Sequence, residues 1–137
     1  MKKSLVVSFL AASAFSIAAH AATPTKVDPV KACFDRAQNQ DQTAACYDKA
    51  IGAQKKRLNA AYNKLIAHRK DDPKAIDALN QMQKNWIKWR DGTIDYMNHN
   101  VAANGSTLQT VSSDFMLDAV TKQADLLESI RDMEGGE

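Results

Sequence analysis

The sequence predicts an all-α protein, a small antiparallel bundle of three long helices that is preceded by one short helix and carries one disulfide. Apolar residues recur at intervals of three, four and seven along most of the chain, as they do on one face of a helix. The 3 prolines and 5 glycines are few enough to leave long uninterrupted segments. No segment shows the alternation of a strand, and short connections favour antiparallel neighbours.

Residues 1–21 have the features of a cleaved secretory signal peptide. Lys2 and Lys3 precede an apolar stretch that ends in an A-x-A cleavage pattern at positions 19–21. A retained N-terminal anchor is the alternative, but the stretch is short for a membrane span. No cysteine stands directly after the cleavage point, so we expect no membrane anchor in the mature protein and a periplasmic location.

Cleavage at this point sets the expected domain organisation. Mature protein should begin at Ala22, and residues 22–28 should form a flexible leader. A single helical domain is expected over residues 29–134, with a frayed C-terminus over 135–137. A chain of this size can form one domain with a real core.

The charge balance changes when the signal peptide leaves. The full chain has 18 Lys and Arg against 16 Asp and Glu. Lys2 and Lys3 are lost while every acidic residue stays, so the mature chain carries 16 residues of each sign. This balance disfavours nucleic-acid binding, which needs a net basic footprint, and the ordinary apolar content argues against a disordered chain.

Two helix starts are marked by the same pair of residues. Asp28-Pro29 and Asp72-Pro73 each offer a capping carboxylate followed by proline at the first helical position. The first helix is expected over 29–38, and the third from 73 to about 98. The second should begin between 41 and 43 and end near 69, with Lys55, Lys56 and Arg57 on a solvated face.

The segment from Asn98 to Ser106 is predicted to be a loop. It contains Asn-His-Asn and Asn-Gly-Ser, which are typical of turns. Ser106 or Thr107 could then cap the fourth helix. Loops on rigid scaffolds often carry binding function, so the candidate partner-binding residues here are Asn98, His99, Asn100, Asn104, Gly105 and Ser106.

Cys33 and Cys46 are expected to form a disulfide, because an even number of cysteines in an exported protein usually pairs. On antiparallel helices they would lie at similar heights, about 10 Å and about 7 Å from the intervening turn. The link would contribute roughly 3 kcal/mol in the chain-entropy model.

The sequence contains no recognisable catalytic constellation. With the cysteines paired, no nucleophile stands beside a histidine, and no carboxylate lies in an apolar stretch that would raise its pKa. Glycine-rich phosphate loops are absent, and the two mature histidines lack the paired spacing of a zinc site. We therefore expect neither an enzyme, a cofactor nor a bound metal.

Gln83, Trp86 and Arg90 share one face of the third helix with apolar residues, as their spacing shows. Two polar side chains, Gln83 and Arg90, are unusual in such an apolar stripe. Buried polar groups need partners. The structural reading is a network in which Trp86 packs, Arg90 meets a carboxylate or helix-end carbonyls, and Gln83 bonds to backbone. The alternative reading is that this face stays partly open and binds a partner.

These residues also carry a family resemblance. Cys46, the segment Leu58-Asn59-Ala60-Ala61-Tyr62, the segment Gln83 to Asp91 and the Asn104-Gly105-Ser106 loop occur in that order. The pattern resembles the LprI-type lysozyme-inhibitor family of small exported bacterial proteins, over nearly the whole mature chain. The motif residues, which we expect to be mainly structural, are Leu58, Asn59, Tyr62, Gln83, Trp86, Arg90 and Asp91.

The chain departs from this family pattern in two respects. The family often has a second cysteine pair, and none is present here. Lys55 stands where family members often have an acidic residue.

The resemblance implies a binding protein that inhibits a lysozyme-type muramidase. Such an inhibitor needs a rigid scaffold and no catalytic residues. The alternative is a periplasmic structural or stress-related interaction module with no enzyme target. The sequence does not indicate the oligomeric state.

Overall fold

The computed structural model describes residues 28–135 and consists of four helices. These are α1 (Pro29–Phe34), α2 (Gln40–His68), α3 (Pro73–Asn100) and α4 (Gly105–Met133). The described residues contain no strand. The expected signal peptide, nearly all of the expected leader and the last two residues lie outside this range.

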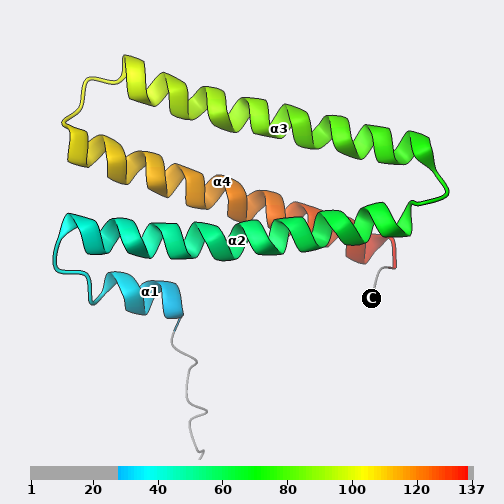
Figure 1. The fold of residues 1–137 in the computed structure, drawn as a ribbon, viewed down its shortest axis with the longest axis horizontal. Helices are drawn as coiled ribbons and strands as arrows, with labels where there is room; N and C mark the ends of the chain where they lie inside the picture. The colour runs from blue at the N-terminus through cyan, green and yellow to red at the C-terminus, as the bar shows by residue number, and fades with distance from the viewer. Residues whose placement is uncertain (1–27, 136–137) are drawn as a thin grey trace, which may run out of the picture.

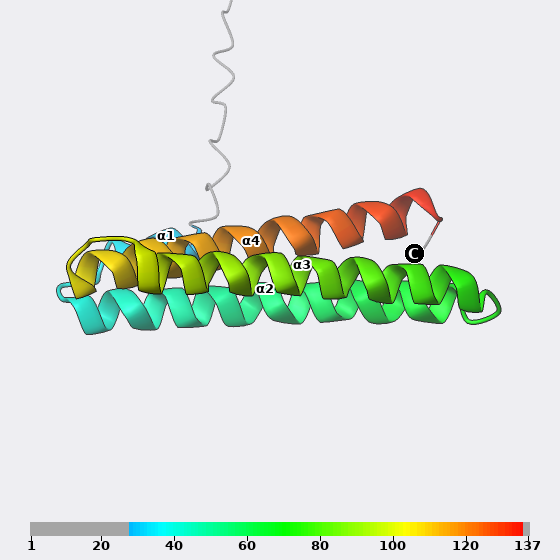
Figure 2. The ribbon, with the colours of Figure 1, turned by 90° about the horizontal axis from the view of Figure 1, so that it is seen from above.

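The three long helices lie side by side in up-down-up order, and α1 folds back along the start of α2 (Figures 1 and 2). This arrangement confirms the predicted all-α bundle of three long helices and one short one. Because α2 and α4 run in the same direction, neighbouring side chains on these two helices rise in residue number together. The hydrogen bond from Tyr47 to Asp114 and the ion pair between Arg69 and Glu134 follow this register.

Both predicted Asp-Pro helix starts are confirmed. An oxygen of the Asp28 carboxylate accepts a hydrogen bond from the backbone N–H of Val30 at 2.9 Å. Asp72 does the same for the backbone N–H of Ala75 at 3.1 Å. Each cap satisfies a donor that the first turn of a helix leaves without an intrahelical partner.

The predicted bounds of the first two helices need correction. Helix α1 ends at Phe34 rather than near residue 38. The Asp35 N–H still bonds four residues back, to the Lys31 carbonyl, but the N–H groups of Arg36 and Ala37 bond only three residues back. Helix α2 begins at Gln40, since the side chain of Asn39 caps it by accepting from the backbone N–H of Gln42.

The predicted loop over residues 98–106 is also wrong in its extent. Helix α3 continues to Asn100, and the chain becomes extended only at Val101. Asn104, rather than Ser106 or Thr107, caps α4, because its side chain accepts from the backbone N–H of Thr107 at 2.8 Å. The connection therefore spans residues 101–104 alone.

The Cys33–Cys46 disulfide is confirmed, with a Cα–Cα distance of 5.8 Å. Helix α1 buries none of its residues, so packing alone does not hold it in place. The disulfide joins it to α2, and the ring of Phe34 meets that of Tyr47 edge-on at a centroid distance of 4.7 Å. These two contacts fasten the short helix to the bundle.

The core lies between α2 and α4. Small side chains allow these helices to approach closely, and the buried alanines on them are Ala50, Ala61, Ala119 and Ala124. The largest fully buried side chains are those of Leu65, Leu127 and Val120, which are also on α2 and α4.

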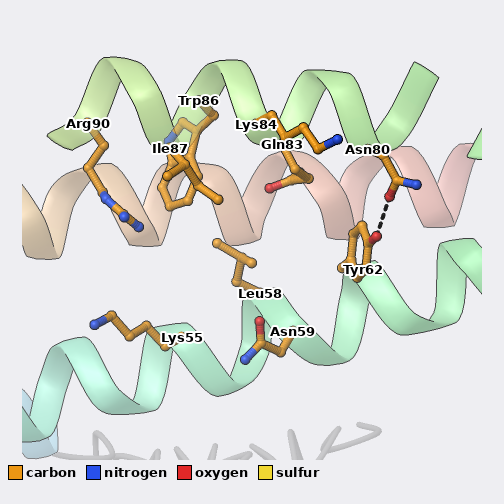
Figure 3. Close-up of a pocket in the computed structure, with 10 residues that line it drawn as sticks. All are labelled: Lys55, Leu58, Asn59, Tyr62, Asn80, Gln83, Lys84, Trp86, Ile87 and Arg90. Carbon is orange, nitrogen blue, oxygen red and sulfur yellow. Dashed lines mark hydrogen bonds between the residues drawn. The ribbon is translucent and has the colours of Figure 1, made fainter. Parts of the chain in front are cut away.

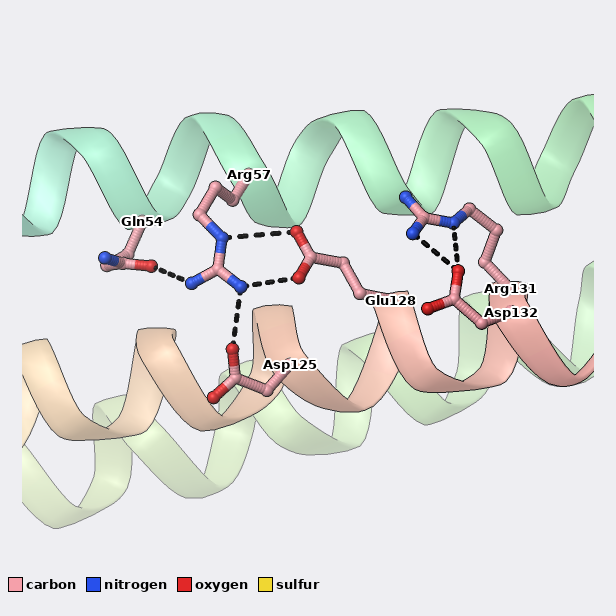
Figure 4. Close-up of polar contacts among 6 residues, drawn as sticks. All are labelled: Gln54, Arg57, Asp125, Glu128, Arg131 and Asp132. Carbon is pink, nitrogen blue, oxygen red and sulfur yellow. Dashed lines mark hydrogen bonds and ion pairs between the residues drawn. The ribbon is translucent and has the colours of Figure 1, made fainter. Parts of the chain in front are cut away.

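A polar cluster reinforces the same helix pair on its surface (Figure 4). The Arg57 guanidinium forms two hydrogen bonds with Glu128, at 3.2 and 2.5 Å, and one with Asp125 at 2.8 Å. These hydrogen bonds raise the pKa of Arg57. Arg57 lies on a solvated face as expected, with 39% of its side chain exposed, and it also pairs with the acidic residues of α4 opposite it.

Helix α3 packs less tightly than the other two long helices. Gln83 is its only residue in the buried class within the described chain, whereas α2 and α4 bury four and five residues. Leu79 and Met82 lean against the α2–α4 core and are partly buried. The seam between α2 and α3 is therefore more open than the seam between α2 and α4.

Candidate functional site

A groove of about 450 Å³ lies along the α2–α3 seam (Figure 3). It brings together six of the seven predicted motif residues, although they come from segments more than twenty residues apart in sequence. Asp91 is the exception, because it is exposed and does not line the groove. The six motif residues that line it are Leu58, Asn59, Tyr62, Gln83, Trp86 and Arg90.

One end of the groove is closed by a hydrogen bond between the two helices. The Tyr62 hydroxyl donates to the side-chain oxygen of Asn80, and Figure 3 shows this pair bridging α2 and α3. Tyr62 also packs against the core cluster around Leu65 and Leu127. The pair therefore fixes the spacing of the two helices at this end.

The middle of the groove is apolar. Leu58 reaches up from α2, while Trp86 and Ile87 come down from α3 (Figure 3). Ile87 is 42% exposed, although removing an apolar side chain of this type from water lowers the free energy. The groove thus offers apolar surface that residues 28–135 do not cover.

The other end is cationic. Arg90 extends from α3 toward α2, and Lys55 lies at the same end of the groove on α2 (Figure 3). A third cation, Lys84, extends from α3 toward the Asn80 end of the groove (Figure 3), and none of the ten lining residues carries a carboxylate. No ion pair involves either lysine among the described residues, and Arg90 pairs only with its sequence neighbour Asp91, at 2.6 Å.

The predicted structural network of Gln83, Trp86 and Arg90 is found only in part. Arg90 does meet a carboxylate, and its guanidinium lies 4.8 Å from the Trp86 ring centroid, in the range of a cation–π contact. However, Asp91 is exposed and on the same helix, so the pair links no two elements. Trp86 is only partly buried, which fits the more open of the two readings.

Gln83 departs furthest from the predicted network. Its side chain is 8% exposed, and its Nε2 donor is buried without a hydrogen-bond partner. The expected bond to backbone is therefore absent at this donor. An unpaired buried donor costs about 1–3 kcal/mol, so the groove has an unsatisfied polar group in its wall.

The predicted partner-binding residues at the α3–α4 end are exposed but do not form one loop. Asn98, His99 and Asn100 belong to the last turn of α3, where His99 Nδ1 lies 2.9 Å from the backbone oxygen of Asp95. Gly105 and Ser106 open α4. Only Asn104 lies in the connection, and its side chain serves as the helix cap.

A second hollow, of about 410 Å³, lies beside this end of the bundle. Asn98 and Gly105 line it together with apolar side chains that include Ile51, Ile94 and Leu108. Two of the six predicted residues are therefore brought together at a concave surface.

Four groove residues were not predicted as part of a site. They are Lys55, Asn80, Lys84 and Ile87. Helical periodicity could have found three of them, because Asn80, Lys84 and Ile87 are spaced by four and three residues and share one side of α3. The position of Lys55 depends on how α2 and α3 align.

The described chain offers no evident centre for metal binding or membrane insertion. Residues 28–135 hold no cluster of three or more His, Cys, Asp or Glu side chains that could hold a metal ion. Within the same range, no helix combines the length and apolar character that crossing a bilayer requires. The groove is lined instead by apolar, amide and cationic groups, which suit binding by packing, hydrogen bonding and charge.

The fold and groove define a class of small all-α proteins in which a disulfide fastens a short helix to a three-helix bundle with one open seam. A family model described as lysozyme inhibitor LprI matches residues 33–127, more than half of the chain. The chain belongs to the LprI lysozyme-inhibitor family, which confirms the motif resemblance. Searches of curated proteins and of solved structures found no significant match.

Proposed function

We propose that this protein is exported to the periplasm, where it binds lysozyme-type muramidases and inhibits them stoichiometrically. The observation that carries the proposal is the LprI family match over residues 33–127. Muramidases cleave their substrate with a pair of carboxylates that flank the scissile bond in a cleft. A protein that occupies or covers such a cleft blocks the reaction without chemistry of its own, so the inhibitor needs no catalytic residues.

The α3–α4 end of the bundle is the proposed contact surface. Its side chains come from two helix ends and a short connection, so their backbone is more rigid than that of the long loop expected from sequence. A rigid surface binds at a lower entropic cost than a flexible one. The hollow beside Asn98 and Gly105 gives this end a concave surface for an enzyme side chain to enter.

The test is inhibition of cell-wall lysis by purified mature protein with the disulfide formed. Lysis should slow in proportion to complex formed and should saturate near one inhibitor per enzyme. His99→Ala combined with Asn100→Ala should weaken inhibition at least tenfold while leaving the melting temperature unchanged, because both residues are exposed.

The matched control changes two exposed residues at the opposite end of the bundle. Lys70→Ala combined with Asp71→Ala also preserves net charge and should inhibit like the parent protein. Failure against several lysozyme classes at micromolar concentration would reject the inhibitory function. Inhibition that is equal in both double variants would reject only the contact surface.

A further inference from the structure

The α2–α3 groove has an apolar middle and a cationic end. Among the described residues Lys55 forms no ion pair, and Arg90 pairs only with its exposed sequence neighbour Asp91. Leu58, Trp86 and Ile87 form the middle, and Lys55 with Arg90 forms the cationic end (Figure 3). Tyr62 and Asn80 close the opposite end. This polarity along the groove specifies which chemical groups a ligand should carry and in what order.

The groove has the size of a small-molecule site. Its volume of about 450 Å³ falls in the range of roughly 300–1,000 Å³ that is typical of ligand pockets, which are mostly apolar and carry a few polar groups that fix orientation. A stable protein–protein contact needs about 800 Å² from each partner, which is a much broader surface than ten residues around one groove provide.

Charge determines the ligand's polar end. No carboxylate lines the groove, and among the described residues neither Lys55 nor Lys84 forms an ion pair. A carboxylate suits this site because lysine and arginine form strong charge-assisted hydrogen bonds with it.

We propose that this groove binds a small organic acid with an apolar body, with the carboxylate between Lys55 and Arg90 and the apolar body along Leu58, Trp86 and Ile87. This ligand site is distinct from the proposed muramidase contact at the α3–α4 end and does not depend on it. Its test therefore uses the mature protein alone, with no enzyme present.

Straight-chain carboxylates below their micelle-forming concentration are the probes. The chain has 2 tryptophans, so Trp89→Phe leaves Trp86 as the only reporter inside the groove. Decanoate should change the emission of Trp86 with 1:1 stoichiometry and a dissociation constant on the order of 100 µM. Affinity should rise about fourfold for each added methylene until the groove is filled.

Two control ligands separate the contribution of the carboxylate charge to binding from that of the apolar chain. 1-Decanol has a similar chain without the charge, and decyltrimethylammonium has one with the opposite charge. Both should bind at least tenfold more weakly than decanoate, because each lacks the interaction with Lys55 and Arg90. Equal affinity for decanoate and 1-decanol would overturn the proposal, as would the absence of any chain-length dependence.

Two adjacent exposed lysines provide the matched variants. Lys55→Gln removes a cation from the groove and should weaken decanoate binding about threefold to tenfold. Lys56→Gln removes the same charge from a neighbouring position that does not line the groove, and should leave affinity unchanged. Equal losses in the two variants would show only a general charge effect and would overturn the site.

Self-association gives a second decisive outcome. Sedimentation velocity should show a monomer of unchanged mass with and without decanoate if the groove takes the ligand itself. If decanoate fails to bind while the protein dimerises with a change in Trp86 emission, the groove is an interface between copies and the proposal is wrong.

Discussion

Gln83 occupies a position that a helical bundle normally fills with an apolar side chain. It is the one buried residue of α3 in the described chain, and its amide donor has no partner. Gln123 on α4 has the same defect, since its Nε2 is also buried and unpaired. Only Gln83, however, lines the α2–α3 groove. The two residues therefore allow the cost of an unpaired donor to be measured at two sites that differ in surroundings.

Gln83→Met should raise the free energy of unfolding by about 1 kcal/mol, because methionine has a similar shape and removes a buried donor that lacks a partner. Gln123→Met serves as the control and should raise the free energy of unfolding by a similar amount. Urea denaturation followed by circular dichroism measures both. A loss of stability in Gln83→Met would show that its amide is satisfied in solution, for instance by a bound water.

At the residue scale, the sequence identified most of the residues that line the groove but not the partners of their side chains. Periodicity placed Gln83, Trp86 and Arg90 on one face, which the structure confirms. It could not show that Asp91 would turn outward and leave Arg90 without a partner across the seam. It also could not distinguish Lys55, which lines the groove, from Arg57, which meets Glu128, because that difference depends on the rotation of α2 against its neighbours.

At the scale of elements, helix starts were easier to predict than helix ends. Asp28 and Asp72 each precede proline, and both cap helices as expected. The end of α3 was placed too early, because asparagine and histidine are common in turns yet also occur in a last helical turn. Asn104 was missed as a cap because Ser106 and Thr107 offered similar chemistry close by.

The C-terminal ends of α2 and α4 are joined by an ion pair that should respond to pH. Arg69, at the end of α2, donates to both carboxylate oxygens of Glu134, at the end of α4, over 3.1 and 2.6 Å. These hydrogen bonds hold the pKa of the Glu134 carboxyl below its ordinary value of 4.5. A carboxyl with a lowered folded-state pKa stabilises the protein above the unfolded-state pKa, and this contribution is lost as pH falls through the folded-state pKa.

Arg69→Gln should therefore lower the melting temperature at pH 7 by about 1–4 °C, as expected for a largely exposed pair. The difference from the parent protein should shrink toward zero as the pH falls through the folded-state pKa of Glu134, because the carboxyl is then protonated in both proteins. Lys70→Gln removes an adjacent cation that forms no ion pair among the described residues, and should show no such pH dependence. A difference that persists undiminished at low pH would mean that Arg69 acts through packing instead.

At the scale of the whole molecule, the three long helices do not contribute equally to stability. Helices α2 and α4 share the buried alanines, the fully buried Leu65 and Leu127, and the Arg57 cluster. Helix α3 leans on this pair mainly through partly buried side chains such as Leu79 and Met82. The molecule is thus a tight two-helix core with a third helix laid along it, and the open seam beside Trp86 follows directly from that imbalance.

Hydrogen exchange should reveal this division. Local opening is easiest where few apolar contacts are buried, so amides of α3 around residues 83–94 should exchange on the order of tenfold faster than those of α2 around 58–65. NMR or mass spectrometry can measure both segments in one sample. Decanoate should slow exchange in the α3 segment more than in α4, because a ligand in the groove adds contacts between α2 and α3. Equal protection of all three helices without ligand would contradict the division, since it would mean that α3 opens only when the whole bundle unfolds.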